Sequence, residues 1–247
     1  MLDILYRDEH LIAINKPAKL LVHRSEIDRH ETRFAIQLLR DQIGRMVWPV
    51  HRLDRGTSGV LLFALDRDTL ALAGQAFERN EVEKEYLAVV RGWPEAQGVI
   101  DHPLTRQYDP YESRPEEEPA PQEACTRFER LATVELPFAV DRYPASRYAL
   151  LRLFPETGRR HQIRRHLKHI AHPIIGDATH GKGVHNRFFT TQFGSERMLL
   201  ACTHLRLPHP LSQHTLDLEA PLDPAFSAVL AQTGLAYGLK PAKATTN

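Results

Sequence analysis

Short strand-like segments, separated by turns of a few residues, recur along this chain and constrain its fold more than any other feature. Residues 4–15 form two strand patterns around a polar turn, residues 60–65 are a continuous apolar run, and residues 84–91 and 147–155 are also strand-like. Antiparallel neighbours need only short turns, whereas parallel neighbours need long crossovers. We therefore predict an α+β fold class with a mixed, mostly antiparallel sheet.

Helical patterns are fewer and should flank this sheet. Residues 33–43, followed by Gly44, and residues 68–78 have apolar side chains at helical spacing. A third helix is expected to begin near Gly158, and residues 204–221 alternate as a half-exposed hairpin would.

Length and composition indicate one domain. With 247 residues and 42% hydrophobic content, the chain can bury one substantial core, which we assign to residues 1–240, with a frayed tail at 241–247. Residues 108–123 carry four prolines and six carboxylates, and they are predicted to form a mobile surface insertion. Neither a signal peptide nor an apolar run of about 18 residues is present, so we expect no membrane contact and a cytoplasmic location.

Metal and cofactor chemistry receive no support from the sequence. The two cysteines form no CxxC pair, and His166, His169 and His172 are spaced so that they do not share one helix face. No cysteine or carboxylate accompanies these histidines, and no cofactor motif is present. We therefore predict no metal and no cofactor.

Charge is distributed unevenly, although the net charge is only +1. Residues 157–172 hold five Arg or Lys, four His and no carboxylate. On a helix, Arg160, Arg164 and Lys168 would form one row, while Ile163 and Leu167 would face a core. A solvated basic face is the alternative, but an anionic partner such as phosphate explains the missing carboxylates more simply.

A second charged segment, HRLDRGTSG at residues 51–59, joins two predicted strands. Asp54 lies between Arg52 and Arg55, and these cations favour an ionised carboxylate that can act as a nucleophile or base. The alternative is an ordinary surface ion pair in a strand connection. The segment matches neither the kinase HRD pattern nor the hydrolase GxSxG pattern.

Four separated motifs, in order, resemble those of the RluA-type pseudouridine synthases. They are ILYRDEHLIAINKP, HRLDRGTSGVLLFAL, KEYLAVVRG and TGRRHQIRRHLKHIAHPIIGD, and LACTHLRLPHP matches a later segment of the family. The resemblance implies the pseudouridine synthase catalytic fold. Because the pattern begins at residue 2, we expect no S4 RNA-binding domain.

The resemblance also implies roles for single residues. Asp54 would be the catalytic carboxylate, Tyr86 would pack on the target base and can serve as a base, and Arg164 would pair with Asp54. The reaction breaks the N1–C1′ bond of uridine and rejoins the base through C5, which requires no metal or redox cofactor. The residues expected to contact RNA are Arg52, Arg55, Arg160, His161, Gln162, Arg165 and Lys168.

Within the family, LVHRSEIDRHE and HPIIGDATHG resemble the TruC-type branch, which modifies uridine 65 in the T-stem of tRNA. The expected partner is therefore RNA, most simply tRNA, with no obligate protein partner. Three alternatives remain: a ribosomal RNA synthase with the same chemistry, a non-catalytic RNA-binding protein, and a histidine-dependent metal hydrolase.

Overall fold

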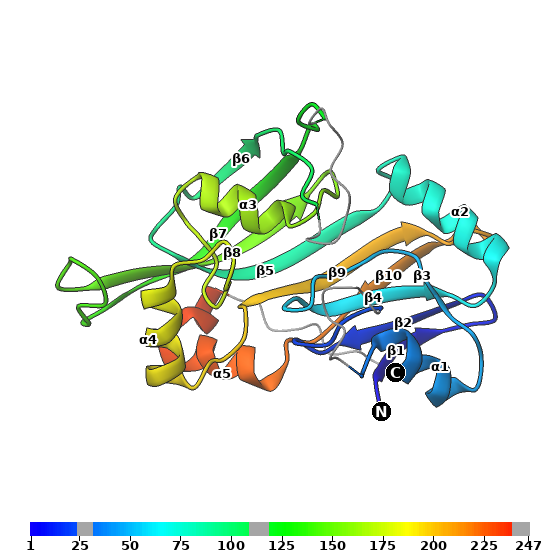
Figure 1. The fold of residues 1–247 in the computed structure, drawn as a ribbon, viewed down its shortest axis with the longest axis horizontal. Coiled ribbons are helices and arrows are strands. Elements are labelled where there is room, and N and C mark those ends of the chain that lie inside the picture. The colour runs from blue at the N-terminus through cyan, green and yellow to red at the C-terminus, as the bar shows by residue number, and fades with distance from the viewer. Residues whose placement is uncertain (24–31, 109–118, 239–247) are drawn as a thin grey trace.

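The computed structural model describes residues 1–23, 32–108 and 119–238, which are built around one ten-stranded sheet (Figure 1). Its main path runs β1-β2-β4-β9-β5-β8-β7-β6, with β10 paired to β9 and β3 paired to β4. The strands are β1 (Asp3–Arg7), β2 (Leu11–Lys16), β3 (Trp48–Pro49), β4 (Ser58–Ala64), β5 (Glu83–Arg91), β6 (Gln97–Asp101), β7 (Cys125–Leu136), β8 (Ser146–Pro155), β9 (Leu200–Pro208) and β10 (Thr215–Glu219).

The strand pairing confirms the predicted fold class. The pairs β1–β2 and β9–β10 are antiparallel, as predicted from their short polar turns, and the one parallel pair between these named strands is β4–β9. The continuous apolar run lies in β4, which is buried on both faces, as such a run predicts.

Gly59 makes the parallel junction between β4 and β9 possible. Its φ is +107°, and a Cβ atom built on it would lie 1.9 Å from the carbonyl oxygen of Cys202. Only glycine allows this backbone conformation and this close approach. Gly59 therefore brings the 51–57 segment to the middle of the sheet.

The helices flank the sheet. They are α1 (Ala35–Ile43), α2 (Arg67–Glu78), α3 (Gln162–His169), α4 (Gly183–Phe193) and α5 (Pro224–Thr233), followed by the 3₁₀ turn η1 (Leu235–Gly238). Both early helices were predicted. Helix α1 ends at Gly44 in the left-handed conformation, and α2 begins after Asp66, whose carboxylate accepts the N–H of Thr69.

Helix α3 begins at Gln162, so the predicted start near Gly158 was wrong. The preceding residue, His161, has a φ of +54°, which no helix interior allows. The side-chain oxygen of Gln162 accepts hydrogen bonds from Thr157 Oγ1 and the N–H of Arg159. These bonds fold residues 157–161 into a loop instead of a first helical turn.

Apolar packing on both faces of β8 positions α3. Leu151 packs with Ile163 and Leu167 of α3, whereas its neighbour Leu150 packs with Phe189 of α4 on the opposite face. Figure 1 shows α3 above this part of the sheet and α4 and α5 below it. The predicted core-facing positions of α3 are thus confirmed.

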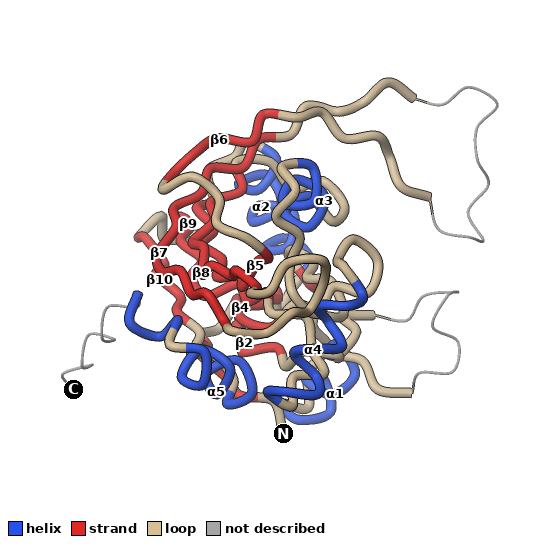
Figure 2. The backbone as a smooth tube through the Cα atoms, turned by 90° about the vertical axis from the view of Figure 1, so that its left-hand side faces the viewer, coloured by secondary structure: helices blue, strands red, loops and turns tan. Residues whose placement is uncertain are grey.

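Several elements carried no clear sequence signal, and some predictions fall outside the described residues. Strands β6 and β7 and helices α4 and α5 were not predicted. Most of the 108–123 insertion and all of the 241–247 tail lie outside the described residues, and Figure 2 draws the parts that are not described in grey. No helix in the described part of the chain is long and apolar enough to cross a membrane.

Candidate active site

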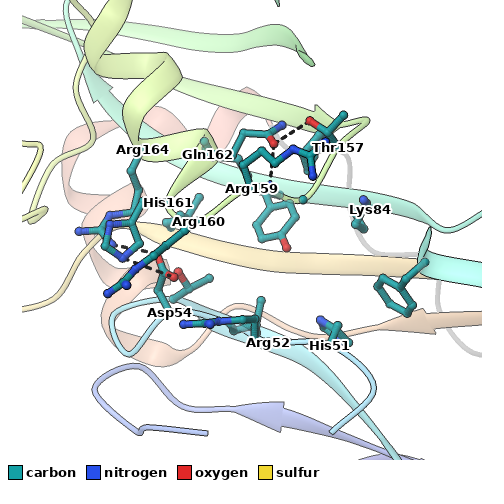
Figure 3. Close-up of a pocket in the computed structure, with 18 of the residues that line it drawn as sticks. His51, Arg52, Asp54, Lys84, Thr157, Arg159, Arg160, His161, Gln162 and Arg164 are labelled. Carbon is teal, nitrogen blue, oxygen red and sulfur yellow. Dashed lines mark hydrogen bonds and ion pairs between the residues drawn. The ribbon is translucent and has the colours of Figure 1, made fainter. Parts of the chain in front are cut away.

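A cavity of about 620 Å³ lies where the 51–57 loop, β5 and the start of α3 meet (Figure 3). Asp54, Tyr86 and Arg164 line it together, although 32 and 78 residues separate them in sequence. A second cavity of about 560 Å³ shares Asp54 and Arg164 with the first and extends toward residues 19–23 and 176–179. Asp54 therefore lines two adjoining cavities.

Asp54 pairs with Arg164. The guanidinium Nη1 of Arg164 donates to Oδ2 of Asp54 at 2.8 Å, and the Asp54 side chain retains 21% of its exposure. The charge pattern of residues 51–59 alone predicts Arg52 and Arg55 as the cations that act on Asp54, whereas the family resemblance predicts Arg164. The structure shows the pair with Arg164, which joins the 51–57 loop to α3 across 110 residues of sequence.

Arg164 is buried between two carboxylates. It is 8% exposed, and its Nε and Nη2 donate to the two carboxylate oxygens of Asp177 at 2.6 and 2.8 Å. Burial alone would lower the pKa of Arg164, but the hydrogen bonds and charges of Asp177 and Asp54 raise it. The guanidinium is therefore permanently charged.

This burial corrects the predicted basic row. Arg164 does not stand on an exposed face beside Arg160 and Lys168, because it points into the protein toward Asp54 and Asp177. Arg160 precedes the helix altogether. The carboxylate partners of Arg164 come from other segments, so the local charge pattern does not reveal them.

His161 lies beside Asp54, with Nε2 at 3.9 Å from Oδ1. Its Nδ1 is 3.1 Å from Nε2 of His180. Burial lowers the pKa of His161 to about 4, against the opposing effect of Asp54. The imidazole is therefore neutral at neutral pH and adds no charge next to the carboxylate.

Tyr86 lies half-buried on β5, at a bulge in its pairing with β9, and lines the same cavity as Asp54. Burial raises its pKa well above the usual 10, and the neighbouring Cys202 and Asp54 add to the effect. The phenol is thus protonated at neutral pH. It can stack on a base and donate a hydrogen bond, but the free enzyme does not hold it as a phenolate.

Lys84 is a cavity residue that sequence analysis missed. It lines the Asp54 cavity two residues before Tyr86, and burial lowers its pKa. Residues i and i+2 of a strand share a face, so the placement of Tyr86 already implied that of Lys84. Its ammonium supplies a hydrogen-bond donor at the wall of the cavity.

The predicted RNA-contact residues separate into two groups. Arg52, Arg160 and His161 line both cavities, and Arg55 lines the second. Arg165 donates to the carbonyl oxygen and hydroxyl of Thr105 and lines a third cavity, of about 320 Å³, with Arg52 and Arg160.

Gln162 and Lys168 have different surroundings. The amide nitrogen of Gln162 donates to Cys125 O and Thr126 Oγ1, and its oxygen accepts from residues 157 and 159. This favours a structural role for Gln162 over RNA contact. Lys168 is exposed but is not among the residues lining these three cavities.

The three histidines with a spacing of three have separate protein partners. His166 contacts Thr126 Oγ1 and the carbonyl oxygen of His102, His169 stacks on the His102 ring, and His172 contacts the carbonyl oxygen of Arg91. Within the described ranges, no three His, Cys, Asp or Glu side chains gather as a metal-binding group.

Comparison with known proteins defines the class to which this fold and site belong. The chain belongs to the RNA pseudouridylate synthase family, which it matches over residues 10–169. This range includes Asp54, Tyr86 and Arg164. The chain is accordingly an RNA pseudouridine synthase, an isomerase.

Curated relatives extend the similarity over nearly the whole chain. The tRNA pseudouridine synthase C of Vibrio cholerae is 47% identical over 235 residues, covering 95% of this chain and 96% of the relative. The protein of the same name from Pasteurella multocida is 51% identical over 223 residues, covering 90% and 92%.

Among solved structures, human RNA pseudouridylate synthase domain containing 4 superposes with a TM-score of 0.70 at 25% identity, covering 94% of this chain and 93% of that one. Human RNA pseudouridylate synthase domain containing 1 has a TM-score of 0.69 at 24% identity, covering 92% and 86%, and shares the fold.

Proposed function

We propose that this enzyme isomerises a uridine in tRNA to pseudouridine, with Asp54 as the catalytic carboxylate. One observation carries the assignment of Asp54: it is held against Arg164 while it faces a cavity large enough for a nucleoside. The tRNA substrate is supported by the relatives, which share about half of their residues with this chain and are named tRNA pseudouridine synthase C.

The two oxygens of Asp54 have different surroundings, and this suits a nucleophile. Oδ2 accepts the hydrogen bond from Arg164, whereas Oδ1 has the neutral His161 at 3.9 Å. Arg164 thus orients the carboxylate, and Oδ1 remains available for attack on the sugar or the pyrimidine ring. In the isomerisation, the N1–C1′ bond breaks, a C5–C1′ bond forms, C5 loses its proton and N1 gains one.

Tyr86 and Lys84 fit the handling of the detached base. The Tyr86 ring can stack on uracil, and its protonated hydroxyl can donate to a carbonyl oxygen. The Lys84 ammonium offers a second donor within the same cavity. Together they would hold the base while it turns from N1 to C5.

Arginines in the adjoining cavities fit the RNA backbone. The third cavity is lined by Arg52, Arg106, Arg159, Arg160 and Arg165. Flipping a base out of a stem costs a few kcal/mol, which phosphate contacts beside the target would offset. These arginines therefore support binding of a nucleotide whose neighbours remain on the enzyme surface.

Within tRNA, we propose position 65 of the T-stem as the target, on the resemblance to the TruC-type branch. A compact tRNA presents phosphates on several sides of one base, which suits an enzyme with arginines in the linings of adjoining cavities. Because the base must leave a pair, a mismatch at the target should assist modification.

The test is to incubate the purified enzyme with total tRNA and with ribosomal RNA fragments, and to locate pseudouridine by carbodiimide mapping. A mark at position 65 of tRNA is expected. A mark confined to ribosomal RNA would overturn the tRNA assignment, and a mark in the anticodon stem-loop would overturn the position.

A further inference from the structure

Asp177 is a buried carboxylate next to the active site, and both of its oxygens accept hydrogen bonds from Arg164. It is 1% exposed, and Oδ1 also accepts the backbone N–H groups of Thr179 and His180, both at 2.9 Å. The preceding Gly176 has a φ of +82°, and a Cβ there would lie 2.0 Å from the carbonyl oxygen of Arg197. The backbone of the turn that carries Asp177 therefore requires glycine at position 176.

The donors of Arg164 are divided between the two carboxylates. Nε and Nη2 form a two-pronged bond to Asp177, which fixes the plane of the guanidinium, and this leaves Nη1 to point at Asp54. The contact with Asp54 is a single hydrogen bond. The orientation of Arg164 is thus set by Asp177.

We propose that Asp177 is a positioning residue for the isomerisation, which acts on Asp54 through Arg164. This inference rests on the proposed catalytic role of Asp54. If Asp54 attacks the substrate, the bond formed at its oxygen removes its negative charge. Arg164 then remains paired with Asp177, so it stays in place until Asp54 is released and ionised again.

The same turn supports the second neighbour of Asp54. His180, whose N–H bonds to Asp177, contacts His161, and His161 lies 3.9 Å from Asp54. Burial would raise the pKa of Asp177, but the bonds from Arg164 and the backbone N–H groups outweigh it and lower the pKa. Asp177 therefore remains ionised at neutral pH.

Among the described residues, the titratable or charged groups from other segments that face Asp54 include Lys16 of β2, Tyr86 of β5, His161 and Arg164, and Arg160 lines both cavities beside it. Burial lowers the pKa of Lys16 to about 7 and raises that of Tyr86 well above 10, so both affect the alkaline side of the rate profile, whereas burial lowers the pKa of His161 to about 4. The acid limb of the rate is where a change at Asp177 would be seen.

The experiment compares wild type with Asp177→Asn in single-turnover tritium release from C5-labelled tRNA across pH, together with tRNA binding. The amide cannot accept both donors of Arg164, so we expect a rate loss on the order of 100-fold with unchanged tRNA affinity. The pH midpoint of the acid limb should shift. It should shift to lower pH if Arg164 stays at Asp54 and to higher pH if Arg164 turns away. Either shift supports the proposal, and an unmoved limb overturns it.

A second variant keeps the test decisive if Asp177→Asn does not fold. Asp177→Glu retains the charge, and its rate loss is measured in the wild-type and Arg164→Lys backgrounds. A residue that acts through the guanidinium should lose most of its effect when that guanidinium is absent. Equal losses in both backgrounds would overturn the proposal.

Asp223→Asn is the matched control. Asp223 forms an ion pair with the buried Arg197 and accepts the N–H of Phe226 at the start of α5. Its loss should lower the melting temperature and leave the acid limb in place. A limb shift equal to that of Asp177→Asn would overturn the proposal. Inactivity of Asp54→Asn tests the catalytic role of Asp54 separately.

Discussion

At the scale of single residues, basic side chains that look equivalent in sequence differ in their burial and in their contacts. Arg164 is buried and bonded to two carboxylates, whereas Arg160 lines three cavities with its side chain half-buried, and Lys168 is exposed. The functions of the three should therefore differ. Arg164 should serve the chemical step, Arg160 should serve binding, and Lys168 should contribute only long-range attraction.

This difference predicts the kinetics of three variants. Arg164→Ala should lose turnover at saturating tRNA, because Asp54 loses its orienting partner and Asp177 is left buried and unpaired. Arg160→Ala and Lys168→Ala should mainly weaken binding and reduce its salt slope by up to about one unit each. Single-turnover rates and salt-dependent affinities separate the two effects. Equal loss of saturated turnover in all three variants would argue against this division.

At the scale of elements, the parallel junction of β4 with β9 positions the 51–57 loop, and this junction depends on a close backbone approach at Gly59. Gly59→Ala would drive a methyl group into the Cys202 carbonyl oxygen, 1.9 Å away, at a φ that L-residues rarely adopt. We expect a loss of about 2–4 kcal/mol in the free energy of unfolding, measured by urea denaturation. Gly74→Ala in α2, where nothing lies within 4 Å, should be neutral or stabilising by up to about 1 kcal/mol. Equal effects of the two substitutions would show that the β4–β9 junction does not require glycine at position 59.

The strands and early helices could be predicted from sequence because their signals are local. Apolar runs, alternation and a glycine stop identify β2, β4, β5, α1 and the β9–β10 hairpin. The start of α3 could not be predicted, since it depends on Gln162, whose side chain bonds to residues 157 and 159 and also to the distant Cys125 and Thr126. Asp177 was missed for the same reason, because its role follows from a contact with Arg164 that the sequence pattern does not predict.

At the scale of the whole molecule, buried neutral histidines tie stability to pH. Burial lowers the pKa values of His51, His161 and His185 to about 4 in the folded chain, from the usual 6.5. Below about pH 6.5 the unfolded chain therefore binds more protons than the folded chain. Their contribution to stability is full above that pH and is lost as the pH falls toward 4.

We accordingly expect the melting temperature to fall between pH 7 and pH 5, measured by calorimetry at constant ionic strength. His185→Gln, which cannot titrate but can still bond the Tyr148 hydroxyl, should make this dependence shallower. A melting temperature that stays constant over this range in the wild type would contradict the burial of neutral histidines.

The most direct measurement is tritium release from C5-labelled tRNA by wild type and Asp54→Asn under single-turnover conditions. The amide keeps the size of Asp54 but cannot act as an anionic nucleophile or base, so release should fall to background. Folding, seen by circular dichroism, and tRNA affinity should be preserved. Release by Asp54→Asn at a rate clearly above background, from a preparation free of wild-type enzyme, would contradict the role of Asp54 as the catalytic carboxylate.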